Sequence, residues 1–548
     1  MLFNYKFSGS TSVVSNASSV GMSFAPDTNR TPTFFVGKLH RKLAFREAIS
    51  ALHDVVVSDM RFQPRDKTTY LEWAAQQEAI WLGEYMAELN IGDVKERIAD
   101  LRGQLQTVQR QMNDKMQPYF TARQRYFNFL YERDKDAWFV LDPVITVHPD
   151  EVFFECFSQD ESSYGKLSAN YNVFKEINEF ACGTTNVDYS ADLYNEFQKI
   201  RDYKETDFSI DPSGFSVQTT DEEAYKEVKI DLPDSWVRGF LQVSSAMTLP
   251  ATTLHLHPMD VHDICLMLRR FKERKGPRSI RFKLTPGEPV KLVFEPWNKE
   301  MVCARSRYDG AEAKEIRIWG RRRLLTLERL VPVARGFTVH LLGSGLPSFW
   351  LADLGDMTFT LGLSGWSAND WSRLGNFDLM APRGEIAPAT AQVVFDELKK
   401  TWFATPDALA KQLGYNQQMV LAALGTYTQA GRAIYDLHQG VYRVRELSQD
   451  PLPTDQLRFA NPREAEANRF VADGKVSLQA SQLPEGVRLK GSVTSAGNHT
   501  YHPELLIDLD ERMAKATCDC AYYGQNKLMN GPCEHMLALR MAYGRVPQ

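Results

Sequence analysis

Three cysteines and one histidine near the C-terminus have the spacing of a metal site. The segment CDCAYYGQNKLMNGPCEH contains a C-x-C pair, twelve further residues and a C-x-H pair. Alternate side chains of a strand lie on the same face, so Cys518 and Cys520 can present two thiolates to one ion from a strand end. A Gly-Pro step precedes the second pair, which predicts a helix entered at Cys533 with His535 in its first turn. Three thiolates and one imidazole suit a single tetrahedral, structural zinc ion and leave no ligand position open for catalysis.

The segments around these ligands indicate the module that carries them. KVSLQA, VRLKGSV and ELLIDLD alternate like strands and lead into MAKATCDC, and apolar residues follow His535 at Met536, Leu537, Leu539 and Met541. This arrangement resembles the SWIM zinc finger, in which C-x-C-x(n)-C-x-H follows a β-hairpin and ends in a helix. The resemblance implies a module that is folded by zinc and that binds DNA or proteins.

The long body ahead of the ligands also resembles bacterial SWIM-finger proteins. Some of those proteins are encoded beside AAA-type ATPases and von Willebrand A-domain proteins, so the resemblance implies a partner of either class. The sequence contains no P-loop, no G-x-S-x-G elbow and no H-E-x-x-H helix. We therefore expect a chain that is not itself an enzyme.

Length and composition predict several soluble domains. The 548 residues exceed the roughly 250 that one hydrophobic core usually supports, and the 43% hydrophobic content is ordinary for a globular protein. The sequence pattern predicts an α+β, multidomain chain. Its expected parts are an N-terminal β-rich segment at 1–65, a helical hairpin at 66–137, an acidic α+β region at 138–232, a central β-rich domain with basic runs at 233–388, a winged helix at 389–447, and a β-meander plus SWIM zinc finger at 465–548.

Targeting signals and cysteine usage favour a cytoplasmic protein. No stretch is apolar over the roughly 18 to 20 residues that a membrane-spanning helix needs. The N-terminus lacks the cationic start and unbroken apolar segment of a secretory signal. Seven cysteines, three of them in the last tenth of the chain, indicate reduced thiols with one specialised cluster. We expect no contact with a membrane.

The order of elements after residue 389 is typical of a winged helix. FDELKK predicts a first helix, Thr405-Pro406 the start of a second, Gly414 its end and Asn416 the start of a third, and RAIYDL-HQG-VYRVRE predicts a hairpin. The core of this domain is predicted to contain Leu398, Leu409, Leu413, Val420, Leu424, Ile434 and Tyr442.

Nucleic-acid contacts by this domain would depend on its wing. The third helix, expected at 416–430, contains no Lys or Arg, so base contacts would fall to Gln417 and Gln418. Phosphate contacts would fall to Arg432, Arg443 and Arg445 in the hairpin. A winged helix that only docks on proteins fits the same pattern.

A second set of candidate phosphate contacts lies in the central region. The net charge of −5 hides a run at 269–283 with eight basic residues and one acidic residue, whereas 150–232 is strongly acidic. Such contrast indicates contact with a polyanion or with an acidic domain, and Trp297 and Trp319 nearby are either core aromatics or platforms for bases. The candidate residues are Arg269, Arg270, Lys272, Arg274, Lys275, Arg278, Arg321, Arg322 and Arg323.

Two further patterns favour structural roles. LHLHPMDVHD differs by one position from the H-x-H-x-D-H pattern of metallo-β-lactamases, so we expect His257 to end a strand, Pro258 to open a helix and Asp260 to lie near its positive end. In the expected helical hairpin, a heptad seam predicts a packing stripe or a coiled coil. The seam contains Val94, Ile98, Leu101, Leu105, Val108 and Met112.

These observations leave three classes of function open. The first is a zinc-dependent, non-enzymatic protein that binds DNA or RNA through the SWIM finger, the winged helix and the basic central region. The second is an interaction scaffold that couples a partner ATPase to a target protein. A metal-dependent hydrolase at His255 and His257 is a third, weaker hypothesis.

Overall fold

The computed structural model divides into two compact units, Arg61–Phe139 and the remainder, Met1–Met60 with Val140–Gln548. In the smaller unit a short helical stretch at 100–105 is described, and its heptad residues Leu101 and Leu105 are exposed. The other heptad positions lie outside the described residues. The structure describes residues 12–15, 19–24, 33–58, 100–105, 107, 143–177, 180–186, 197–198, 200–203, 205–210, 234–272, 278–365, 370–371, 377–381, 386–447, 462–495, 497–508 and 513–544.

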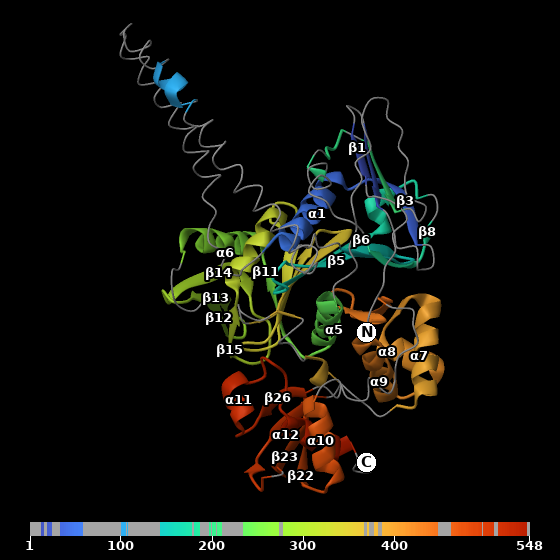
Figure 1. Cartoon of the computed structure of the whole chain (residues 1–548), viewed down its shortest axis with the longest axis vertical. Helices are drawn as coiled ribbons and strands as arrows, with labels where there is room; N and C mark the ends of the chain where they lie inside the picture. The colour runs from blue at the N-terminus through green and yellow to red at the C-terminus, as the bar shows by residue number, and fades with distance from the viewer. Residues whose placement is uncertain are drawn as a thin grey trace. The chain divides into compact units, whose positions relative to one another are not determined.

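An eight-stranded antiparallel sheet forms the centre of the larger unit (Figure 1). Its middle pair joins β6 to β18, so strands from the expected acidic region and from the expected central domain share one sheet. The boundary expected between 232 and 233 therefore does not separate two folds. In spatial order the strands are β11 (Thr252–Leu256), β16 (Gly336–Leu341), β17 (Ser348–Asp353), β18 (Met357–Leu363), β6 (Ser163–Asn170), β5 (Glu151–Phe157), β4 (Val144–Val147) and β9 (Gly183–Asn186).

A helix covers one face of this sheet, and that face is apolar. Helix α1 (Lys42–Val56) packs on β5 and β6. Its buried residues Phe45, Ile49, Leu52 and Val56 recur every three or four positions and so form one stripe along the helix. Beside α1 lies a second, mixed sheet of β1 (Ser12–Ser15), β2 (Ser19–Phe24), β10 (Glu205–Ile210), β3 (Phe34–Leu39), β7 (Phe174–Lys175) and β8 (Phe180–Ala181), with the 3-10 turn η2 (Tyr171–Val173) before β7.

A four-stranded antiparallel sheet lies within the expected central β-rich domain. Ile280, Phe282 and Leu284 alternate inward along its central strand, as the period of two requires. The same expected domain also contains helices: the helix that Pro258 opens was predicted, whereas the helix at Asp234–Met247 was not. The elements are α5 (Asp234–Met247), α6 (Pro258–Arg270), β12 (Ser279–Leu284), β13 (Pro289–Phe294), β14 (Lys299–Arg307), β15 (Lys314–Trp319), the 3-10 helix η3 (Arg321–Leu330) and the turn η4 (Phe377–Leu379).

Three helices and a three-stranded sheet occupy residues 388–444, in the order predicted. The Thr405 hydroxyl accepts a hydrogen bond from Ala408 N at 3.1 Å, Gly414 has a φ of 68°, and the Asn416 side chain accepts from Met419 N at 2.7 Å. These caps end and start helices as expected. The elements are α7 (Pro388–Thr401), β19 (Phe403–Ala404), α8 (Pro406–Leu413), α9 (Gln417–Gln429), β20 (Ala433–Asp436) and β21 (Val441–Val444).

The core of this segment also agrees with the sequence pattern. Five of the seven predicted residues lie in one buried cluster, Ile434 is buried as well, and Leu413 is partly buried. Phe395 and Tyr427 stack in the same cluster, with ring centroids 4.0 Å apart. The five predicted residues of the cluster are Leu398, Leu409, Val420, Leu424 and Tyr442.

The last part of the chain is an antiparallel meander with helices on it. Helix α10 was not predicted, and it packs on α12. Among the described residues, no helix has both the length and the apolarity needed to cross a bilayer. The elements are α10 (Pro462–Ala472), β22 (Val476–Leu483), β23 (Gly486–Thr494), β24 (Thr500–Tyr501), β25 (Glu504–Asp508), β26 (Met513–Thr517), α11 (Ala521–Asn526) and α12 (Glu534–Gly544).

Candidate metal centre

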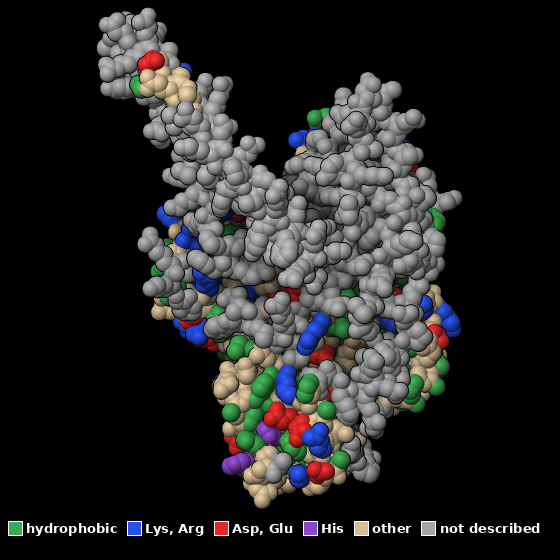
Figure 2. Space-filling view, viewed as in Figure 1, with side chains coloured by type: hydrophobic (Ala, Val, Ile, Leu, Met, Phe, Trp, Pro, Cys, Tyr) green, Lys and Arg blue, Asp and Glu red, His purple; other side chains and the backbone are tan. Residues whose placement is uncertain are grey.

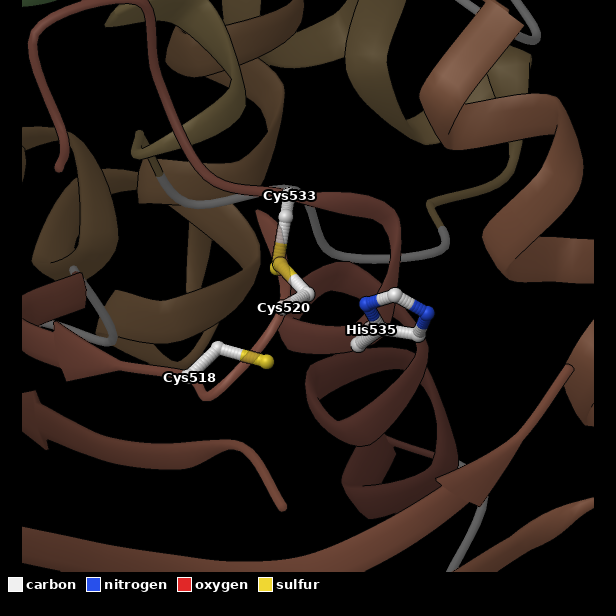
Figure 3. Close-up of side chains that lie close together, drawn as sticks. All are labelled: Cys518, Cys520, Cys533 and His535. Carbon is white, nitrogen blue, oxygen red and sulfur yellow. The ribbon is translucent and has the colours of Figure 1, made fainter. Parts of the chain in front are cut away.

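The four predicted ligands form one buried cluster. The side chains of Cys518, Cys520, Cys533 and His535 converge in Figure 3, and one donor atom from each lies within 4.8 Å of all the others. All four residues are at most 9% exposed. The structure therefore brings together residues that are separated by a twelve-residue segment in the chain.

Local structure explains how each ligand reaches the cluster. β26 ends just before Cys518, and Cys520 caps α11, where its Sγ accepts a hydrogen bond from Tyr523 N at 3.4 Å. Cys533 immediately precedes α12, and its carbonyl accepts from Leu537 N at 3.1 Å. His535 lies in the first turn of α12. The predicted placement at a strand end and a helix start is confirmed, whereas α11 itself was not predicted.

The donor set fits a single metal ion. Sulfur ligands about 2.3 Å from a tetrahedral zinc ion lie roughly 3.8 Å from one another, which agrees with the close grouping of these donors. Within the described part of the chain, Nδ1 of His535 is buried and has no hydrogen-bond partner. A buried nitrogen without a partner is costly, and a metal ion among these donors is one way to satisfy the ring. The structure thus supports one metal ion at a Cys₃His cluster.

The thiols are also poised to ionise unequally. A hydrogen bond from Cys533 lowers the pKa of Cys518 to about 5, with a smaller contribution from His535. The same contact with Cys518, together with burial, raises the pKa of Cys533 far above its usual value. A thiolate is the form of cysteine that binds a metal ion, so one ligand is already available near neutral pH.

Arg463 on α10 supports the loop that carries Cys533. Its guanidinium donates to the carbonyl oxygens of Pro532 and Asn530, each at 2.9 Å, and lies 4.6 Å from the ring centre of Tyr522. The Tyr522 hydroxyl also donates to Asn530 O at 2.9 Å. Nothing in the spacing of the ligands pointed to Arg463, because it belongs to a helix that was not predicted.

Aromatic rings fix the imidazole of His535. Phe470 of α10 is stacked against it at 5.8 Å and 9°, and Tyr501 lies 4.1 Å away on the meander. Asp519, between Cys518 and Cys520, accepts a hydrogen bond from His502 N at 2.8 Å and pairs with His502 Nδ1 at 2.9 Å. The contacts of His535 with Phe470 and Tyr501, and that of Asp519 with His502, were not predicted, because each joins two different elements of the module.

The histidines of LHLHPMDVHD have structural partners. Pro258 opens α6 as predicted, and the His257 side chain caps the helix by accepting from Met259 N at 3.1 Å. His255 contacts Thr338, and buried Asp260 bonds to Ser306 at 2.5 Å. Across the described ranges, the C-terminal cluster is the one group of His, Cys, Asp or Glu that is placed to hold a metal ion.

Several predicted phosphate contacts are used inside the protein. Arg321 donates to Ser279 O at 3.0 Å, and Arg323 donates to Gly365 O at 3.3 Å. Arg443 forms two hydrogen bonds with the carboxylate of Asp150, at 2.9 and 3.0 Å. Arg321, Arg323, Arg443 and Arg445 are all buried, and Arg432, which bonds to Glu446 at 3.1 Å, is nearly so.

The remaining candidates are distributed over the surface. Arg269, Arg270 and Lys272 are exposed at the end of α6, and Gln417 and Gln418 are exposed at the start of α9. Arg278 and Arg322 are half-buried, and Trp297 lies under Arg321 with 37% of its surface exposed. Arg274 and Lys275 fall outside the described residues. The exposed candidates that are described therefore lie on two elements, the end of α6 and the start of α9.

Comparisons with known proteins give no assignment. No protein-family model matches the chain, and no curated protein matches it. Among solved structures, the crystal structure of Proliferating Cellular Nuclear Antigen from Entamoeba histolytica is similar with a TM-score of 0.29 and 11% sequence identity, over 41% of this chain and 89% of that chain. A likeness at this level assigns neither a fold nor a function to the chain.

Proposed function

We propose that this protein is a non-enzymatic, zinc-dependent interaction scaffold. In this proposal the C-terminal module is a SWIM-type zinc finger that zinc holds in its folded form, and residues 388–444 are a winged helix used for docking. The partner is a protein, such as the AAA-type ATPase or von Willebrand A-domain protein that the resemblance implies. The closed Cys₃His set supports a structural rather than a catalytic ion.

A protein partner is favoured because many of the arginine and lysine side chains are paired with carboxylates of the protein itself. The hairpin arginines Arg443 and Arg445 are buried against carboxylates of β5 and its preceding turn, so they are not available to bind phosphates. Lys and Arg side chains gather over α6 and the four-stranded sheet in Figure 2, but the sheet carries matching carboxylates. The sheet pairs are Arg281 with Glu315, Lys283 with Glu300, Lys291 with Glu288, and Arg317 with Glu295.

Nucleic-acid binding remains the second candidate because of the end of α6. Arg269 is exposed at 65% of its side chain even though it pairs with Glu328. Arg270 and Lys272 are exposed and have no ion pair among the described residues. Three cations at one helix end can anchor a phosphate backbone. Gln417 and Gln418 on the exposed start of α9 would then be the base contacts.

One experiment separates the two candidates. The zinc-loaded full chain is titrated into labelled single-stranded DNA, duplex DNA and RNA at two salt concentrations, and fluorescence anisotropy is measured. Binding that weakens with salt, and that is lost in the Arg270→Gln/Lys272→Gln variant, would replace the scaffold proposal with nucleic-acid binding. Loss of two charges elsewhere, in Arg238→Gln/Lys411→Gln, serves as the matched control.

The complementary measurement tests for a protein partner directly. The same preparation, treated with nuclease, is used to capture an ATPase or a von Willebrand A-domain protein, and the complex is measured by size-exclusion chromatography with light scattering. The scaffold proposal requires a stoichiometric complex that survives nuclease. Because the scaffold is proposed to depend on zinc, the complex should also be lost in Cys533→Ser, which removes a ligand from the C-terminal module.

A further inference from the structure

A polar cavity lies between the eight-stranded sheet and the turn that joins β20 to β21. Its volume is about 130 Å³, and it is lined by side chains of β5, β6 and β18 and by residues of that turn. The register places Lys166 beside Thr360 and Ser168 beside Thr358 on neighbouring strands. Consequently this face of the sheet is polar, whereas the face under α1 is apolar.

Glu151 presents an unused acceptor to this cavity. The carboxylate is 4% exposed, and its Oε1 has no hydrogen-bond partner among the described residues. Nε of Arg443 is 3.3 Å from Oε1, but this nitrogen has a single hydrogen, which it donates to Asp436 Oδ2 at 2.9 Å. A buried carboxylate oxygen that accepts no hydrogen bond is costly, so a donor bound in the cavity would stabilise this position.

Lys166 presents unused donors to the same cavity. Its side chain is 5% exposed and its ammonium lies 3.6 Å from Asp436 Oδ2, which is an ion pair too long for a good hydrogen bond. The ammonium is also 4.6 Å from the ring centre of Phe153. In the part of the chain that the structure describes, it forms no hydrogen bond. An oxygen atom placed in the cavity could therefore accept from Lys166.

The charges around the cavity do not balance. Asp150, Glu151 and Asp436 supply three carboxylates, while Lys166 and Arg443 supply two cations that pair with them. Asp356 also lines the cavity, but it is paired with Arg41 and so does not alter this balance. Burial lowers the pKa of the adjacent His148 to about 3, so its ring is neutral near pH 7. An ionised Glu151 therefore leaves one negative charge without compensation in a buried site, and one additional positive charge would neutralise it.

We propose that this cavity binds a small organic ammonium ion that carries hydroxyl groups. The ammonium group donates to Glu151, and a hydroxyl oxygen of the ligand accepts from Lys166. Ser168, Thr358 and Thr360 line the wall and exchange hydrogen bonds with further hydroxyl groups. The volume corresponds to roughly four water molecules, and hence to a ligand of about four to seven non-hydrogen atoms. This site is independent of the metal centre and of the proposed scaffold function.

Three probes of similar size test the charge that the site selects. Isothermal titration calorimetry of the full, zinc-loaded chain is performed with 2-amino-1,3-propanediol, with glycerol as its neutral counterpart and with serine as the zwitterion. We expect the amino diol to bind with a dissociation constant below about 10 mM, which is realistic for so small a ligand. Glycerol should bind at least about tenfold more weakly. Equal binding of glycerol, preferential binding of serine, or no binding of the amino diol would overturn the proposal.

Variants test whether the signal comes from this cavity. Glu151→Gln removes the charge at almost unchanged volume and should weaken binding of the amino diol at least about tenfold, whereas the exposed control Glu315→Gln should leave it unchanged. Circular dichroism checks that Glu151→Gln is folded. If it is not, Thr360→Val provides the decisive variant, because it removes a wall hydroxyl without changing charge. Unchanged affinity in the folded variant would contradict the assignment.

Discussion

Arg463 donates a hydrogen bond to the carbonyl oxygen of Pro532, the residue immediately before the ligand Cys533, at a distance of 2.9 Å. This contact joins α10 to the loop that delivers half of the metal ligands. Groups that orient ligands without touching the ion commonly have strong effects on metal affinity. The metal centre therefore extends beyond its four ligands to a helix about seventy residues upstream in the chain.

Replacement of Arg463 should loosen the metal site without removing a ligand. Arg463→Lys retains the charge but cannot bond to two carbonyl oxygens in the same fork geometry. We expect zinc affinity to fall roughly 10- to 100-fold, as is usual for such supporting residues. Competition with a chromophoric chelator measures it. Arg469→Lys, on the same helix but with its side chain 68% exposed, is the control and should retain the original affinity.

Loss of a ligand should unfold the C-terminal module. Cys533→Ser removes one thiolate, and metal binding in such sites supplies on the order of 10 kcal/mol of folding free energy. We expect zinc content to fall from one ion per chain to none, and proteolysis to begin within residues 462–544 while the eight-stranded sheet stays protected. Cys182→Ser changes a cysteine outside the cluster and should retain the ion. Retention of one ion by Cys533→Ser would contradict the assignment.

The ion pair of Arg445 with Glu155 should matter for stability far more than a surface pair. Both side chains are fully buried, and the Nη1–Oε1 distance is 3.2 Å. Arg445→Met leaves the buried Glu155 carboxylate without its cationic partner, which should reduce the free energy of unfolding by about 3 to 5 kcal/mol. Lys283→Met breaks the exposed pair with Glu300 and should cost less than about 1 kcal/mol. Urea unfolding, followed by tryptophan fluorescence, compares the two variants.

Glu151 should make the sheet less stable as pH rises towards neutrality. Burial raises the pKa of Glu151 in the folded protein from 4.5 to about 7. Its contribution to stability is therefore fully present below pH 4.5 and is lost as pH rises through 7. The difference in opening free energy between the natural protein and Glu151→Gln should fall by roughly 3 kcal/mol across this window. Hydrogen exchange of the β5 and β6 amides measures the opening free energy. A difference that does not change with pH would refute the raised pKa of Glu151.

His148 gives stability the opposite pH dependence, and for this reason the measurement must compare two proteins. Burial lowers its pKa from 6.5 to about 3, so its contribution is present above pH 6.5 and is lost as the pH falls towards 3. Subtraction of the Glu151→Gln profile removes this second dependence, which both proteins share. Glu315→Gln, on an exposed strand, should follow the profile of the natural protein.

Features that depend on neighbouring residues could be predicted from the sequence. The side chains of Thr405 and Asn416 cap helices within three residues, and the strand before Cys518 and the helix after Cys533 follow from short-range patterns. For the same reason the metal ligands could be identified, because thiolate pairs at such spacing have few alternative uses in a cysteine-poor chain.

Features that depend on distant residues could not be predicted. In the sequence, Arg443 is typical of the exposed face of a hairpin. Its burial depends on carboxylates far away in the chain, such as Asp150 in the turn before β5. Pairing of β6 with β18 likewise depends on partners that neither strand specifies locally. The start of α10 contains Pro462, which is equally typical of a loop, and this ambiguity concealed Arg463 as well.

The β6–β18 pair also determines when the eight-stranded sheet can be completed during translation. The edge of β6 is complete roughly 190 residues before β18 emerges, which at 5 to 20 residues per second corresponds to about 10 to 40 s. An uncovered strand edge is a template for pairing with other chains. Newly made protein therefore passes through an interval in which its largest sheet is half built, and chaperones that shield this edge should raise the yield of folded protein.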